Sequence, residues 1–67
     1  MEKIQVRINH KVVNEFESMI EFMRFLDRHN YHTEDELGGQ IKQTFITMND
    51  NFGRPHLVGL AEIVKEE

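Results

Sequence analysis

Hydrophobic and polar residues alternate strictly along residues 3–8, which read Lys-Ile-Gln-Val-Arg-Ile. A period of two with β-branched residues predicts a half-buried strand. The side chains expected to face a core are Ile4, Val6 and Ile8. The polar residues between them would face away from that core.

Residues 9–18 allow two interpretations. In the first, the chain turns back as a second strand. A three-residue turn at 9–11 would then set apolar residues opposite one another better than a two-residue turn at 9–10. Its pairs would be Ile8 with Val12, Val6 with Asn14 and Ile4 with Phe16. In the second interpretation, a helix begins soon after Asn9.

A helix over residues 19–29 is predicted from its ends and its apolar positions. Ser18 followed three residues later by Glu21 is a capping box, and basic residues suit the last turn. The apolar positions of this helix cover an arc of about 220°, whereas a helix lying on one sheet needs about 100°. We expect the surplus, chiefly Phe22 and Phe25, to contact a second copy in a homodimer.

The second half of the chain carries two further apolar segments, 40–48 and 57–65, separated by loop-forming residues at 49–56. Their β-forming residues favour two strands joined by a long hairpin. A helical spacing of apolar residues leaves a helix over 40–48 as an alternative. Residues 30–39 are expected to form a loop.

These elements predict an α+β fold in one domain, 1–67, with one amphipathic helix packed across a small antiparallel sheet. The element order would be ββαββ or βαββ.

Composition narrows the possible functions. A chain of 67 residues rarely encloses a substrate pocket, so we expect no enzyme. It has no cysteine, which excludes thiol chemistry, iron–sulfur clusters and Cys-type zinc sites. His29-x-x-His32 is too short a match to predict a metal site. We expect no cofactor.

No apolar run approaches the length of a membrane helix, and no signal peptide is apparent, so the expected location is cytoplasmic.

The net charge of −4 is unevenly distributed. Residues 1–33 are neutral overall, whereas 34–67 carry three basic and seven acidic residues. An acidic surface formed by residues 34–67 would suit a basic protein partner. Phe52 beside Arg54 is a pair typical of interface hot spots. The residues expected to bind the partner are Glu34, Asp35, Glu36, Phe52, Arg54, Glu66 and Glu67.

The leading functional hypothesis is a small inhibitor that occupies the nucleic-acid-binding face of a DNA-binding protein, with carboxylates in place of phosphates. In size and acidity the chain is similar to bacteriophage proteins that disable host machinery in this way.

Lys3, Gln5 and Arg7 support a different hypothesis. The run Ile4-Gln5-Val6-Arg7-Ile8, followed by apolar positions through Ile20, resembles the start of ribbon-helix-helix DNA-binding proteins. The resemblance implies an intertwined dimer whose paired N-terminal strands read the major groove. Lys3, Gln5 and Arg7 would then contact bases, and the protein would be a transcriptional regulator.

Overall fold

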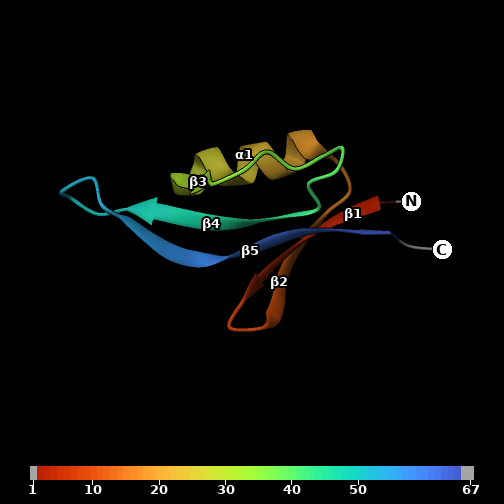
Figure 1. Ribbon diagram of the computed structural model, residues 1–67, viewed down its shortest axis with the longest axis horizontal. Coiled ribbons are helices and arrows are strands. Elements are labelled where there is room, and N and C mark those ends of the chain that lie inside the picture. The colour runs from red at the N-terminus through yellow and green to blue at the C-terminus, as the bar shows by residue number, and fades with distance from the viewer. Residues whose placement is uncertain (1, 66–67) are drawn as a thin grey trace.

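A computed structural model describes residues 2–65, which form one five-stranded antiparallel sheet and one helix (Figure 1). The elements are β1 (Glu2–Ile8), β2 (Lys11–Phe16), α1 (Met19–His29), β3 (Tyr31–Thr33), β4 (Gln43–Asn49) and β5 (Pro55–Lys65). The strand order across the sheet is β2-β1-β5-β4-β3. The predicted α+β class is confirmed, and the order is ββαβββ, one strand more than expected.

The β1–β2 hairpin combines features of both turns that the sequence allowed. The turn has two residues, Asn9 and His10, both with positive φ (53° and 66°), so Ile8 pairs with Lys11. A register shift then adds one residue to β2, and Ile4 pairs with Phe16 as the three-residue turn would require. A β-bulge therefore restores the apolar pairing that a two-residue turn alone would lose. The helical interpretation of residues 9–18 is wrong.

Helix α1 has the predicted bounds. The Ser18 side chain accepts a hydrogen bond from the Glu21 amide at 3.3 Å, which satisfies an otherwise unpaired donor at the helix start. The helix ends at His29, and the next residue, Asn30, adopts the left-handed conformation with φ 57°, a common way to terminate a helix.

Strand β3 lies where a loop was expected. Tyr31, His32 and Thr33 pair with Met48, Thr47 and Ile46 of β4. Three residues are too few for a periodic pattern, so only the pairing with β4 defines this strand. Residues 40–48 are strand from Gln43 onward, and the helical alternative for them is wrong.

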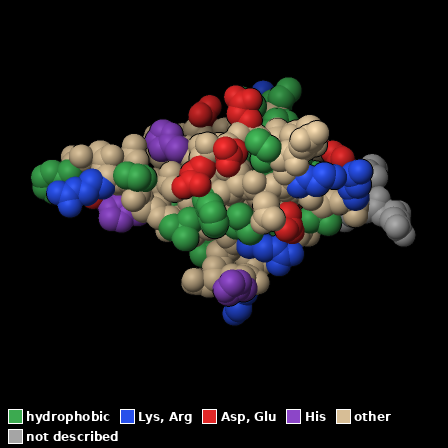
Figure 2. Space-filling model, viewed as in Figure 1, with side chains coloured by type: hydrophobic (Ala, Val, Ile, Leu, Met, Phe, Trp, Pro, Cys, Tyr) green, Lys and Arg blue, Asp and Glu red, His purple; other side chains and the backbone are tan. Residues whose placement is uncertain are grey.

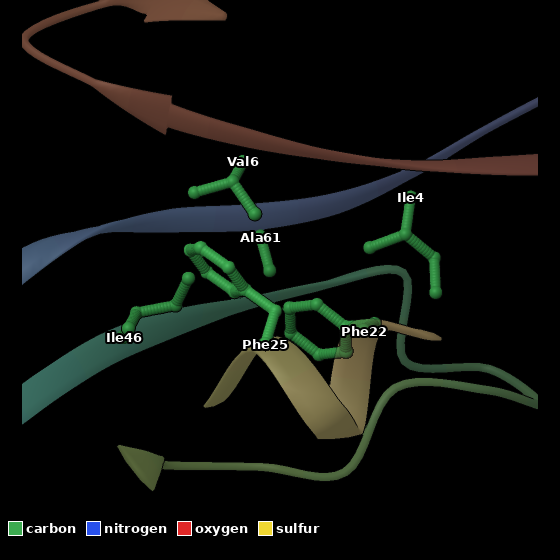
Figure 3. Close-up of a cluster of buried hydrophobic side chains, with 6 residues drawn as sticks. All are labelled: Ile4, Val6, Phe22, Phe25, Ile46 and Ala61. Atoms are coloured by element: carbon green, nitrogen blue, oxygen red, sulfur yellow. The ribbon is translucent and has the colours of Figure 1, made fainter. Parts of the chain in front are cut away.

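The core lies between α1 and one face of the sheet (Figure 3). It comprises Ile4, Val6, Phe22, Phe25, Ile46 and Ala61. Figure 3 shows Phe22 and Phe25 projecting from the helix toward the strands. Burial of these apolar side chains is the main stabilising contribution of the helix.

The expectation that Phe22 and Phe25 contact a second copy is corrected by their burial within one chain, where they are only 2% and 8% exposed. The wide apolar arc is covered from both sides by neighbouring aromatic residues. Phe16 of β2 lies 5.1 Å from Phe25 between ring centroids, and Tyr31 of β3 lies 5.7 Å from it. The exposed apolar residues of the helix are instead Ile20 and Met23.

Candidate functional site

The sheet face opposite the helix carries a mixture of apolar and charged side chains. The register places Arg7 of β1, Leu60 of β5 and Phe45 of β4 in one row across three strands. Gln5 and Glu62 belong to the next row. Since side chains alternate between the two faces of a sheet, the side chains of these rows point away from the face on which Val6 and Ala61 are buried. We call this surface the open face.

Two hollows of about 330 and 350 Å³ lie on the open face and share Phe45 and Leu57. Together we call them the open-face groove. Arg7, His10 and Leu60 line one part of it, and Glu34, Thr47 and Pro55 line the other. Phe45 is 49% exposed and Leu57 67% exposed. Figure 2 shows hydrophobic side chains gathered over β4 and β5, with acidic side chains close by.

A β-bulge puts Leu57 on the open face. Ile46 pairs with Gly59, but the next residue, Thr47, pairs with Leu57, so Val58 is an extra residue in β5. Continuous alternation from the buried Ala61 would have pointed residue 57 toward the helix. The bulge reverses that orientation, and Val58 packs against the core instead.

The acidic segment Glu34-Asp35-Glu36 is held against β4. The Glu34 amide donates to the Phe45 carbonyl at 3.2 Å, and the Asp35 amide donates to Thr44 Oγ1 at 2.9 Å. All three acidic residues are exposed. The carboxylate-bearing segment is therefore anchored by its backbone, and Glu34 borders the groove. Glu66 and Glu67 lie outside the described residues.

The loop between β4 and β5 forms one end of the long axis of the molecule, which extends 43 Å (Figure 1). Phe52 at this tip is 81% exposed, and the Arg54 guanidinium lies 5.4 Å above its ring, a favourable cation–π arrangement. Neither residue is among those that line the groove. The predicted binding residues thus fall on two surfaces, the groove border and the hairpin tip.

Asp50 organises this tip. One carboxylate oxygen accepts hydrogen bonds from the Phe52 amide at 2.8 Å and the Arg54 amide at 3.0 Å. The other accepts from His56 Nε2 at 2.9 Å. The hydrogen bond from His56, followed by that from the Arg54 amide, holds the pKa of the Asp50 carboxyl below its ordinary value of 3.8. The loop that carries the exposed Phe52 ring is therefore held by three hydrogen bonds to Asp50.

The residues predicted to read DNA bases are instead engaged with neighbouring side chains. Gln5 donates to Glu15 at 3.1 Å, and Lys3 Nζ lies 3.8 Å from a Glu15 carboxylate oxygen. Arg7 donates to Gln5 at 3.1 Å, and its Nε lies 3.7 Å from Glu62.

The ribbon-helix-helix resemblance is also contradicted by the topology. That fold needs an N-terminal strand that pairs with a second copy. Here β1 is an interior strand, paired with both β2 and β5 of its own chain. Its two edges are already occupied, so an intertwined ribbon cannot form around it.

Among residues 2–65, no three histidine or acidic side chains are grouped so that they could hold a metal ion. His29 stacks on Tyr31, with ring centroids 5.2 Å apart, and His32 lies in β3. Over the same residues, α1 is too short and too polar to cross a membrane.

The chain matches no protein-family model, and neither a curated protein nor a solved structure is significantly similar to it.

The groove residues Phe45 and Leu57 were not predicted as binding residues. The alternation along 43–47 could have indicated the exposure of Phe45, since it places this side chain on the other face of the strand from Thr44 and Ile46. No sequence signal identified Leu57, because its orientation depends on the bulge.

Proposed function

We propose that this chain is a non-enzymatic protein-binding domain that captures a basic protein on its open face. One observation carries the proposal: Glu34, Phe45 and Leu57 line the same hollow. Apolar side chains next to the carboxylate of Glu34, on a segment anchored by its backbone, suit a partner that offers an apolar residue flanked by lysine or arginine. The apolar pair supplies burial, and the carboxylates supply steering and orientation.

The biological role that we propose is inhibition in the cytoplasm. A basic surface of the required kind is typical of proteins that bind nucleic acid. The acidic segment would stand in for backbone phosphates and exclude nucleic acid from that surface by competition. The net charge of −4 and the backbone anchoring of Glu34 and Asp35 support this role.

Capture from cell lysate with the immobilised chain tests the proposal. The wild type is compared with a Glu34→Lys, Asp35→Lys, Glu36→Lys variant and with Leu57→Ala. The matched control reverses three other exposed acids, Glu2, Glu17 and Asp27, to lysine. It makes the same change of net charge away from the acidic segment.

We expect the wild type and the matched control to recover the same basic protein, and both test variants to lose it. Recovery should fall steeply as salt rises, and added duplex DNA should release the captured protein. Equal recovery by the wild type and the acidic-segment variant rejects the proposed surface. Release by salt but not by DNA rejects competition with nucleic acid and leaves protein capture standing.

A further inference from the structure

The hairpin tip holds the aromatic side chain of Phe52 in solvent, although several hydrogen bonds hold its loop. Asp50 fixes the Phe52 and Arg54 amides, and the Asp50 amide donates to the Arg54 carbonyl at 2.9 Å. Gly53 closes the turn with φ 76°, and its amide donates a hydrogen bond to the Asp50 carbonyl at 3.0 Å. The loop is therefore built to present Phe52 rather than to cover it.

The tip and the open-face groove have complementary chemistry. The tip combines one aromatic ring with one cation, Phe52 and Arg54. The part of the groove away from Arg7 combines apolar side chains, Phe45 and Leu57, with the carboxylate of Glu34. An apolar group with an adjacent cation is the class of ligand that such a groove accepts.

The tip cannot reach the groove of its own chain. Leu57 and Phe52 lie on the same hairpin, whose strands pair up to Asn49 and Pro55. The loop beyond that pair is fixed by the hydrogen bonds of Asp50. Bending the tip back would break these bonds, and Phe52 is indeed exposed. Contact between tip and groove is therefore intermolecular.

We propose that the open-face groove binds the Phe52–Arg54 tip of a second copy of this chain. In a two-fold symmetric pair, each tip enters the groove of the other subunit, so every contact is made twice. Arg54 of one copy then faces Glu34 of the other, and Phe52 packs on Phe45 and Leu57. The homodimer expected from the sequence is thereby assigned to the hairpin and not to the helix.

This dimer covers the groove to which the proposed function assigns a basic partner. A partner then competes with self-association, and the free monomer is the form that binds. The inference does not require such a partner to exist, since the tip and the groove both belong to this chain.

Charge exchange at the proposed contact tests the inference. Sedimentation velocity is run on the full chain from about 1 μM to about 1 mM, the range in which weak dimers dissociate. The variants are Arg54→Glu, Glu34→Arg and the double variant with both changes. We expect each single variant to weaken dimerisation about tenfold, because repulsion replaces attraction at two symmetric contacts. The double variant should restore wild-type association.

The control variant is Arg28→Glu, which reverses an exposed charge in the last turn of α1 and should leave dimerisation unchanged. Amide spectra of each variant show whether its fold is retained. The side chains of Arg54 and Glu34 are exposed, and the hydrogen bonds of their backbone amides remain available after substitution.

Two results overturn the inference: a wild-type chain that is monomeric throughout the range, or a double variant no stronger than the single ones. Neither result touches the proposed function, which is read from partner capture. If Glu34→Arg abolishes partner capture while the wild type is monomeric, the groove serves a different protein only. If Arg54→Glu lowers dimerisation and raises partner capture, the competition between them is established.

Discussion

His56 donates a hydrogen bond to Asp50 across the base of the β4–β5 loop, with 2.9 Å between Nε2 and Oδ2. Together with the Phe52 and Arg54 amides, this bond stabilises the ionised carboxylate, so the pKa of Asp50 is lower in the folded chain than the ordinary 3.8. The stabilisation is complete above pH 3.8 and is lost as the pH falls through the lower, folded value. Amide and carboxyl resonances followed by NMR should give a midpoint for Asp50 below 3.8.

The Phe52 and Arg54 amide resonances should move with the same midpoint, because both amides donate to the Asp50 carboxylate. In Asp50→Asn this transition should be absent. Replacement of Asn51 by alanine, in the same loop, serves as the control and should preserve it. A midpoint for Asp50 at or above 3.8 contradicts the proposed organisation of the tip.

Replacing Gly59 by alanine should destabilise the fold by about 1–3 kcal/mol, the usual cost of forcing an extra group into a packed site. A β-carbon at this position would overlap the Arg7 carbonyl oxygen and press on the Ile8 side chain. Both belong to β1, so the strand would have to shift. Urea denaturation measures the loss.

The comparison for Gly59→Ala is Leu57→Ala in the same strand, which should cost less than about 1 kcal/mol because Leu57 is largely exposed. Equal midpoints for Gly59→Ala and the wild type disprove the close approach of β1 and β5.

Thr44→Val tests what holds the acidic segment in place. Thr44 is 3% exposed, and its hydroxyl accepts the Asp35 amide. Valine keeps the shape of the side chain but removes the acceptor, so stability should fall by about 1 kcal/mol. Hydrogen exchange at the Asp35 amide should become faster. Thr47→Val, on the open face of the same strand, should leave that exchange rate unchanged. Unchanged exchange in Thr44→Val contradicts the anchoring.

Phe22→Ala should cost about 3–5 kcal/mol, as expected for truncation of a buried aromatic residue. Met23→Ala, at the next position on the exposed side of α1, should cost less than about 1 kcal/mol. Denaturation at several protein concentrations shows whether Phe22 stabilises the monomer core or a dimer interface. A loss for Phe22→Ala that disappears on dilution assigns this residue to a dimer interface and contradicts its place in the monomer core.

Local signals in the sequence predicted β1 and α1 well, because alternation and capping depend on residues close together in the chain. Features that depend on pairing between distant segments were missed. Strand β3 exists only through β4, and the bulge at Val58 needs both β4 and β5. The apolar arc of α1 suggested a second copy because the sequence does not show that Phe16 and Tyr31 cover its sides.

The same distinction applies to the site. The acidic segment 34–36 and the pair Phe52 and Arg54 were recognised from residue type alone. Their separation onto a groove border and a hairpin tip depends on how β4 is paired. Phe45 and Leu57 form a shared surface only after the strands are aligned, so no local pattern could have joined them.

Strand β5 lies between β1 and β4 in the sheet although it follows both along the chain. Without β5, the β1–β2 hairpin and the β3–β4 pair would share no strand, and only the contacts of α1 with Phe16 and Tyr31 would join them. Completion of the sheet therefore requires pairing between segments that are far apart in the chain, which is slow to form, and a species without β5 in place leaves one edge of β1 and one edge of β4 unpaired.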